Sequence, residues 1–386
     1  MIVYGCKISY YTGKLETYLR YRSIDYQVLP TVGNEQTLIA ETGVVQMPVV
    51  QDNRGRWMTD TTPIIAQLES EQSAASIYPL CPLMHIIALL IEDYADEWLW
   101  RPAMHFRWSY RVSRQYAAEV LYDELIRDNP NRYIPRFIAL RMLKARQYFG
   151  FVQGDGVNKQ SRGHADSTYS KSLELLEAIF KQRPFILGNT PTIADVGLMG
   201  PMFRHFSQDP VPAEIMRETA PNVFEWVARM WNSKGGDKTP DLLTEPDAML
   251  ISLLREISET HLAQLQQNAR AWSDGKNRFD LNIQGSTYRN APSSRYRVWC
   301  LEELQRAWAS LNAANQAQLK AVLTEAEDRM RNDLGAELAR LEALRQLNPA
   351  IREEELEHLR YRIEECAIHI QHASLQLQAL RLVITT

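Results

Sequence analysis

Four hydroxyl side chains follow one another near the start of the sequence, just before a first expected helix. They are Ser9, Tyr10, Tyr11 and Thr12, and a Gly-Lys pair comes next. A hydroxyl at the start of a helix can donate a hydrogen bond to an anion, because the free amides there attract negative charge. It can equally serve only as a helix cap. The cluster is therefore either a site of chemistry or a structural cap.

A second set of candidate residues lies in the middle of the chain. It is a stripe of aromatic and basic side chains at steps of four, three, four and three residues: Tyr94, Trp98, Arg101, His105 and Trp108. This spacing predicts one face of a helix, and Pro102 should kink that helix near Trp98. The face could line a pocket for an apolar electrophile. Alternatively, it belongs to a domain-interface helix in which Asp93, Glu97 and Arg101 form ion pairs.

Metal binding and cysteine chemistry receive less support. The acidic run "EDYADE" at 92–97 has no Glu-x-x-His pair beside it, so we expect ion pairing rather than a metal site. The four cysteines are far apart and form no Cys-x-x-Cys motif, which argues against zinc and against a disulfide framework. That usage suits a reducing cytoplasm. Cys6 is a rival nucleophile, although it precedes the expected turn.

The first seventy-odd residues alternate short strands and helices in the order βαβαββα. Strands are expected at "IVYG", "DYQVLP", "MPVVQD" and "RWMT". Helices are expected over 13–23, 35–42 and 61–70, the last with a threonine cap and an early proline. A sheet this small needs a layer of other elements to cover it. We assign residues 1–75 to this first domain.

From 83 to 232 the pattern is almost wholly helical and predicts a second domain. Near its end, Thr192 and Asp195 have the spacing of a capping box ahead of an apolar run. Residues 233–310 are interpreted as a Gly- and Pro-rich linker, a helix and an extended or hairpin segment with alternating Phe279, Leu281 and Ile283. Residues 311–386 predict an antiparallel helical hairpin or coiled coil, because a heptad seam follows Pro349. Plain globular-core helices are the alternative for that last part.

Length and composition limit the class of protein. A chain of 386 residues exceeds one ordinary core, so two or three domains are expected. The net charge of −4 gives no reason to expect nucleic acid as a partner. No apolar run approaches the ~20 residues of a membrane span, and the first residues lack the features of a signal peptide.

Three motifs, taken together, resemble cytosolic glutathione transferases. They are "VYGCKISYYTGKLETYLRYRSIDYQ", "VVQMPVV" followed by "WMTDTTPIIAQLE", and "PTIADVGL". They are similar, in order and spacing, to the first βαβ unit, the strand entered through a cis-proline with its acid-plus-hydroxyl turn, and the capping box of the buried helix in that family. The resemblance covers roughly the first 60% of the chain and implies a thioredoxin-like domain followed by an all-helical one. The remainder is an extension that typical transferases lack.

The resemblance implies glutathione as co-substrate and assigns roles to several residues. Met47, before a cis Pro48, would pair with the peptide backbone of glutathione. Thr61 would hold the γ-glutamyl carboxylate and Asp60 the ammonium group. Capping of the helix at 61–70 is the structural alternative for these two residues, and the two roles are compatible.

The expected chemistry is deprotonation of the glutathione thiol, because the thiolate is the nucleophile. Ser9 is the leading candidate for the hydroxyl that stabilises it, and Tyr10 is its rival. The enzyme would then attack an apolar electrophile or remove glutathione from a conjugate. The alternative is a non-catalytic scaffold that binds a partner protein through the C-terminal extension. The family also implies a possible homodimer, which the extension could replace.

Overall fold

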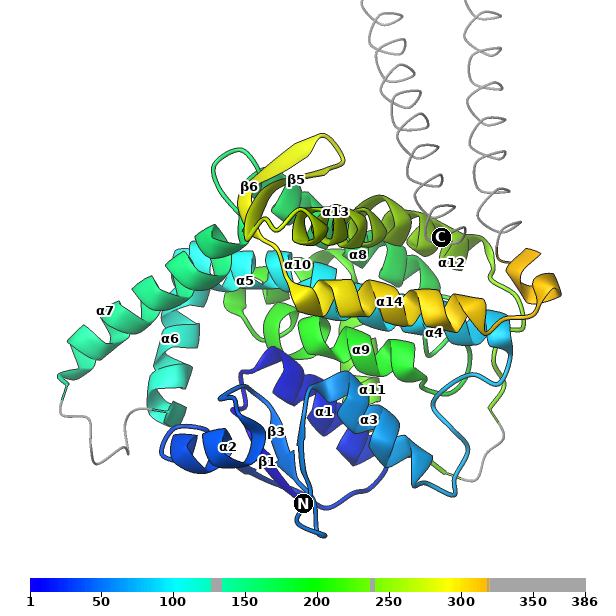
Figure 1. Cartoon of the computed structure of the whole chain (residues 1–386), viewed down its shortest axis with the longest axis horizontal. Helices are drawn as coiled ribbons and strands as arrows, with labels where there is room; N and C mark the ends of the chain where they lie inside the picture. Colours follow the sequence, from blue (N-terminus) through cyan, green and yellow to red (C-terminus); the bar gives the residue numbers. More distant parts are fainter. Residues whose placement is uncertain (126–133, 237–239, 318, 320–386) are drawn as a thin grey trace, which may run out of the picture.

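The computed structural model describes residues 1–125, 134–236, 240–317 and 319. The expected helical hairpin at 311–386 therefore lies almost entirely outside the described residues. The described part holds a small sheet unit, a helical unit beside it and an extension packed on the helical unit (Figure 1). No helix of this part is long and apolar enough to cross a membrane.

The N-terminal unit has the predicted order βαβαββα. Its elements are β1 (Ile2–Tyr4), α1 (Tyr10–Tyr21), β2 (Gln27–Leu29), α2 (Glu35–Thr42), β3 (Val49–Gln51), β4 (Trp57–Thr59) and α3 (Thr61–Ser70). The sheet order is β2-β1-β3-β4; β1 pairs parallel with β2 and antiparallel with β3. The peptide bond between Met47 and Pro48 is cis, as the sequence predicted. This is a thioredoxin-like arrangement, and the expected fold of this unit is confirmed.

The helical unit covers one side of the sheet unit. Its α-helices are α4 (Pro82–Asp93), α5 (Trp100–Ser109), α6 (Arg111–Leu125), α7 (Arg136–Gln147), α8 (Arg162–Phe180), α9 (Ile193–Pro201), α10 (Pro210–Thr219) and α11 (Pro221–Asn232). Short π-helices follow three of them: η1 (Tyr94–Trp98), η2 (Tyr148–Val152) and η4 (Met202–Phe206). The 3₁₀-helix η3 (Gln153–Asp155) comes directly after η2. Helix α9 packs against both α1 and α4. Gly200 permits this approach, because a Cβ there would lie 2.8 Å from the ring of Tyr10.

The predicted capping box is present at the start of α9. Both Asp195 carboxylate oxygens are used: one accepts from the amide of Thr192 at 3.0 Å and the other from the amide of Ile186 at 3.0 Å. The indole of Trp226 adds a third hydrogen bond at 3.2 Å. Burial raises the pKa of Asp195 to about 6, and these donors oppose the rise. The box therefore fixes the start of the helix on which α1 and α4 rest.

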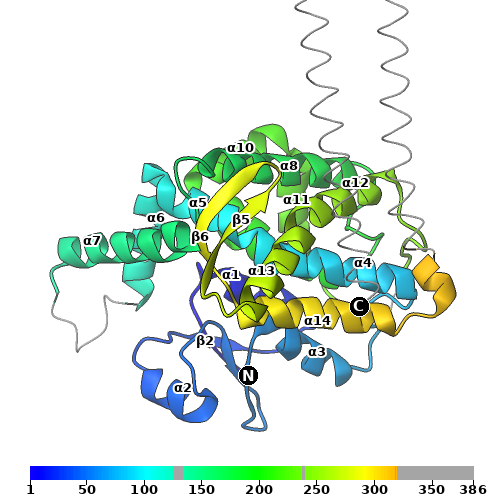
Figure 2. The ribbon, with the colours of Figure 1, turned by 45° about the horizontal axis from the view of Figure 1, so that its top comes forward.

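The extension consists of α12 (Ala248–Ile257), the π-turn η5 (Ser258–Leu262), α13 (Ala263–Ser273), the hairpin β5 (Arg278–Ile283) and β6 (Ser286–Pro292), and α14 (Arg295–Ala309). The expected hairpin is confirmed: Leu281 and Ile283 are buried, whereas Phe279 is only partly buried. Figure 2 shows α14 lying between α4 and α3, so the extension touches both units. The chain before it is anchored too, since Leu243 donates to the carbonyl of Leu187 at 2.8 Å.

Candidate functional site

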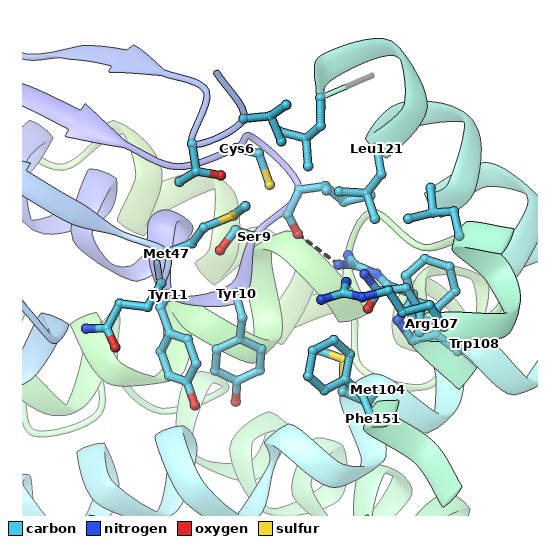
Figure 3. A pocket seen from close by; sticks show the side chains of 18 of the residues that line it. Cys6, Ser9, Tyr10, Tyr11, Met47, Met104, Arg107, Trp108, Leu121 and Phe151 are labelled. Carbon is cyan, nitrogen blue, oxygen red and sulfur yellow. Dashed lines mark hydrogen bonds between the residues drawn. The ribbon is translucent and has the colours of Figure 1, made fainter. Parts of the chain in front are cut away.

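A cavity of about 700 Å³ opens between the sheet unit and helices α5, α6 and α7 (Figure 3). The sheet unit contributes the turn between β1 and α1 and the loops before α2 and β3. The helical unit contributes mainly aromatic and aliphatic side chains, including Trp100, Met104, Leu121, Leu143 and Phe151. A concave, mostly apolar site of this size is typical of small-molecule binding.

Ser9 lines this cavity and caps helix α1. Its backbone is extended (φ −72°, ψ 136°), and its Oγ accepts a hydrogen bond from the amide of Thr12 at 3.3 Å. The helix therefore begins at Tyr10, three residues earlier than the predicted start near Gly13. Because Oγ is the acceptor in the capping bond, the hydroxyl proton stays available to a ligand. The helix N-terminus reinforces the preference for an anion at this point.

Tyr10 and Tyr11 line the cavity with their rings, but their hydroxyls are used elsewhere. The Tyr10 hydroxyl donates to the carbonyl of Ala95, and the Tyr11 hydroxyl donates to that of Asp96 at 3.0 Å. In Figure 3 both hydroxyls lie at the far ends of the rings from Ser9. Burial, followed by the charge of Asp96, raises the pKa of Tyr10 well above its ordinary value. Of the two candidates for the catalytic hydroxyl, the geometry favours Ser9.

The thiol of Cys6 lies in the same cavity wall and stays protonated at neutral pH. Burial, aided by the charge of Glu124, raises its pKa to about 12. A buried, protonated thiol is a poor nucleophile. The rival assignment of Cys6 is therefore not supported. No group of His, Cys, Asp and Glu side chains among the described residues could hold a metal ion.

Arg107 connects the turn that carries Ser9 to the helical unit. Its guanidinium donates to the carbonyl of Ile8 at 2.8 Å and to the carboxylate of Asp209 at 2.8 Å; Arg107 is among the side chains in Figure 3. All three residues are buried. Burial raises the pKa of Asp209 to about 6, and the charge of Arg107 opposes that rise. Because Ile8 precedes Ser9, this contact fixes where the Ser9 hydroxyl points.

The residues assigned to glutathione lie in two places. Met47 lines the cavity and Pro48 is buried behind it. Asp60 and Thr61 stand at the N-terminus of α3 but are not among the cavity-lining residues. Asp60 has a positive φ of 69° and its carboxylate accepts from the amide of Thr62 at 3.4 Å. It is thus a helix cap, as the structural alternative proposed.

The extension contacts the N-terminus of α3, where Asp60 stands. Burial raises the pKa of Asp60, and a hydrogen bond from Tyr296 of α14, then the charge of Lys14, opposes the rise. Lys14 is itself buried and bonded to Thr62, Glu92 and Asp96. The helix N-terminus at α3 therefore has a neighbour from beyond residue 232, which sequence reasoning did not anticipate.

The five predicted residues of the aromatic stripe lie on two different sides of their helix. Trp108 lines the cavity, as predicted. The other four predicted residues face the helical core or the extension: Tyr94 bonds Ser172 at 3.0 Å, Trp98 meets Tyr288 edge-on, Arg101 bonds Gln264 at 2.8 Å, and His105 contacts Asp166 at 3.2 Å. The cavity is not lined by them. The interface alternative describes these four better than the pocket prediction does.

The ion pairs at this interface also differ from the predicted ones. Asp93 contacts His261 at 2.7 Å, Glu97 contacts Arg297 at 3.0 Å, and Arg101 contacts Asp155 at 3.1 Å. Each acidic or basic residue thus finds a partner outside its own helix. A break follows η1 before Pro102, where Leu99 bonds the carbonyl of Tyr94 five residues back. This turn supports the predicted kink.

Sequence reasoning missed the neighbouring face of the same helix. Trp100, Met104 and Arg107 line the cavity at steps of four and three, beside the predicted Trp108. These steps are helical as well, so periodicity alone could not choose between the two faces. The α7 residues Met142 and Arg146 were also missed, although the spacing of the apolar residues in that segment was visible.

Comparison with known protein families matches three separate segments of the chain. Residues 3–76 match the glutathione S-transferase N-terminal domain, and residues 159–229 match the glutathione S-transferase C-terminal domain. Together with the thioredoxin-like sheet and the helical unit, these two matches support a glutathione S-transferase-like family for residues 3–229. Residues 263–385 match a third family, described as the C-terminal part of the RNA polymerase recycling family.

Several solved structures are similar to this chain at low identity. A glutathione S-transferase from Rhodospirillum rubrum F11 is 18% identical over 59% of this chain and 86% of its own, with a TM-score of 0.39. A glutathione transferase homologue from Drosophila mojavensis with bound glutathione is 19% identical over 59% and 85%, with a TM-score of 0.37. A β-etherase from Sphingobium sp. strain SYK-6 is 15% identical over 59% and 93%, with a TM-score of 0.42. The family assignment rests on the two domain matches.

Proposed function

We propose that the protein binds glutathione and activates its thiol for reaction with an apolar electrophile, or for removal of glutathione from a conjugate. The observation that carries this proposal is the position of Ser9. Its hydroxyl caps the first helix, lines an apolar cavity and lies in the same cavity wall as Met47 of the cis-proline loop. These are the features that a thiolate site in this family requires.

The chemistry follows from hydrogen bonding and the helix N-terminus. A free thiol has a pKa of about 8.5, so only a few per cent is thiolate at neutral pH. A hydrogen bond from Ser9 to sulfur favours the charged form, and each pKa unit corresponds to about 1.4 kcal/mol. The thiol proton leaves to solvent, the sulfur forms a bond to the electrophilic carbon, and the leaving group departs with the bonding electron pair. In removal of glutathione from a conjugate, the thiolate of a second thiol attacks the carbon that carries glutathione, a new carbon–sulfur bond forms, the old one breaks, and glutathione leaves as the thiolate with the bonding pair.

Glutathione would lie with its backbone against Met47 and its γ-glutamyl end toward the N-terminus of α3, where Thr61 and Asp60 stand. The fit is incomplete at the other end, because no Lys or Arg of the sheet unit lines the cavity in the described part of the chain. The electrophile would occupy the apolar part beside Trp100, Met104 and Trp108. We also propose a cytoplasmic location, which agrees with the free thiols of Cys6, Cys81 and Cys300.

The first test is a calorimetric titration with glutathione. Heat of binding at micromolar to millimolar glutathione supports the proposal, and no heat at millimolar glutathione contradicts it. In the bound protein, Ser9→Ala should lower turnover with a model electrophile about tenfold to a hundredfold, while affinity changes little. Tyr10→Phe is the matched control, because its hydroxyl is bonded to Ala95. A loss of turnover in Tyr10→Phe alone would assign the role to Tyr10 instead.

The second candidate is a non-catalytic scaffold that binds a partner through the extension. The match of residues 263–385 to the RNA polymerase recycling family favours it. RNA polymerase is therefore the first partner to test, by co-elution of the full chain with the purified core enzyme. The two functions are compatible. A homodimer remains part of the proposal, and the mass of the full chain in solution would decide it.

A further inference from the structure

Helix α7 has an exposed apolar face beside the mouth of the cavity. Phe137 is 74% exposed, Met142 58% and Ile138 38%, and Phe149 in the following turn is 60% exposed. Figures 1 and 2 both show α7 projecting from the body of the molecule. Scattered single exposed apolar residues are ordinary, but several on one projecting helix mark an interaction surface.

The same segment carries positive charge and has no acidic residue of its own. Residues 134–154 contain four basic side chains and no Asp or Glu, in a chain with a net charge of −4. Arg136 pairs with Glu119 and Lys144 bonds Gln115 at 2.9 Å. Arg141 and Arg146 are exposed, and no ion pair holds either of them among the described residues. Three of the four positive charges of this segment therefore have no ion-pair partner among the described residues.

The buried, apolar and basic side chains of α7 occupy different positions around the helix axis. Ala139 and Leu140 are buried toward the body. With about 100° per residue, Phe137, Ile138 and Met142 lie toward the opposite side, with Arg141 among them and Lys144 and Arg146 at the flanks. A helix whose exposed side combines apolar residues with Lys and Arg can lie in the interface of a bilayer.

We propose that α7 binds the surface of an anionic lipid bilayer. A purely electrostatic partner, such as nucleic acid, would account for the cations but not for the protruding Phe137 and Phe149. A lipid surface accounts for both, because headgroups attract the cations and the acyl boundary takes the apolar side chains.

Because α7 borders the cavity, its exposed surface has a functional role in this proposal. Met142 and Arg146 line the cavity as well as belonging to the exposed face. An apolar molecule dissolved in the bilayer could therefore enter the cavity beside α7 without crossing water. The inference does not depend on glutathione chemistry, and its test measures lipid binding alone.

The test is co-sedimentation of the full chain with vesicles, either phosphatidylcholine alone or mixed with phosphatidylglycerol. We expect binding to the anionic vesicles that weakens with salt, and little binding to phosphatidylcholine. Arg141→Glu with Arg146→Glu should lower the partition coefficient at least about tenfold, since each cation near an anionic surface contributes about 1 kcal/mol. Arg217→Glu with Arg289→Glu, two exposed cations on α10 and β6, is the control with the same charge change and should bind like the wild type.

A second pair of variants tests the apolar contribution. Phe137→Ser should also lower binding several-fold, whereas Leu80→Ser, at a side chain 95% exposed and outside α7, should not. No binding to anionic vesicles at low salt would overturn the proposal, as would equal binding of all variants. Self-association that Phe137→Ser abolishes, or DNA binding that replaces vesicle binding, would assign the surface to a second copy or to nucleic acid instead.

Discussion

The two faces of the helix that runs from α4 through α5 carry similar side chains but serve different purposes. The face toward the extension holds Trp98, Arg101 and His105, and their polar groups have protein partners except the Trp98 indole N–H. The face toward the cavity holds Trp100, Met104 and Trp108, with an open volume in front of them. The first face joins two parts of the chain and the second leaves room for a ligand. Side-chain type therefore says less about function than the presence of a packed neighbour.

The largest expected effect is on the extension face, at Arg101. Arg101→Met removes the closer of two cations at the buried Asp155 and the partner of Gln264, and should lower the free energy of unfolding by about 3 kcal/mol, because the carboxylate keeps only the longer contact with Arg297 at 3.8 Å. Arg146→Met, at an exposed position of the cavity mouth, should change it by less than about 0.5 kcal/mol. Urea unfolding measures both. Equal small losses would erase the contrast between the two faces.

The extension side should also make stability depend on pH. Burial raises the pKa of Glu256 to about 7 from its ordinary value of 4.5, with a hydrogen bond from Gln284 opposing the rise. The folded state then binds the proton more tightly than the unfolded state does. Protonation of Glu256 therefore contributes stability that is fully present below pH ~4.5 and is lost as pH rises through 7.

Glu256→Gln should remove this dependence. The difference in unfolding free energy between wild type and variant should change by about 2–3 kcal/mol between pH 4.5 and 8, in favour of the variant at high pH. Chemical unfolding at several pH values measures it. A difference that stays constant with pH would show that Glu256 is not buried in the folded protein.

On the cavity face, the expected effect is on ligand binding. Trp100 stacks on Tyr11 with ring centroids 5.6 Å apart and lines the cavity. Trp100→Ala should weaken binding of an apolar fluorescent probe such as anilinonaphthalene sulfonate about tenfold, because a large aromatic contact is removed. Trp272→Ala on α13, 43% exposed and outside the cavity, is the control. Equal probe affinity in the two variants would place the binding site elsewhere.

The smallest expected effect couples the two regions. Tyr296 of the extension competes for the Asp60 carboxylate that we assign to the glutathione ammonium group. Tyr296→Phe should therefore raise the affinity for glutathione by roughly twofold to fivefold, because water replaces much of what the Tyr296 hydroxyl provides and the net contribution of a hydrogen bond is about 1 kcal/mol. Calorimetry measures the change. Lower affinity would mean instead that Tyr296 helps to hold the ligand.

Much of the fold could be predicted from local pattern. The order βαβαββα, the capping box at Thr192 and Asp195, and the hairpin at 278–292 each depend on residues close together in sequence. The cis bond before Pro48 was expected only from the resemblance to glutathione transferases. The expected start of α1 near Gly13 is too late, because the run of four hydroxyl residues does not say which of them is the cap. Local signals identify such elements but not what packs on them.

The site was harder to predict because it depends on contacts between distant segments. Trp98 and Trp100 are two residues apart, yet one meets Tyr288 of the extension and the other lines the cavity. Nothing in the spacing says which face the extension will cover. Similarly, no local pattern predicts that the Tyr10 hydroxyl bonds the carbonyl of Ala95, 85 residues away.

The central claim is that the Ser9 hydroxyl stabilises a thiolate at the start of α1. The most direct measurement is the ultraviolet absorption of the thiolate of bound glutathione as pH is varied, in wild type and in Ser9→Ala. We predict that bound glutathione titrates at least about one unit below the ~8.5 of a free thiol in the wild type, and nearer to the free value in the variant. Bound glutathione that titrates like the free thiol in the wild type would contradict the claim.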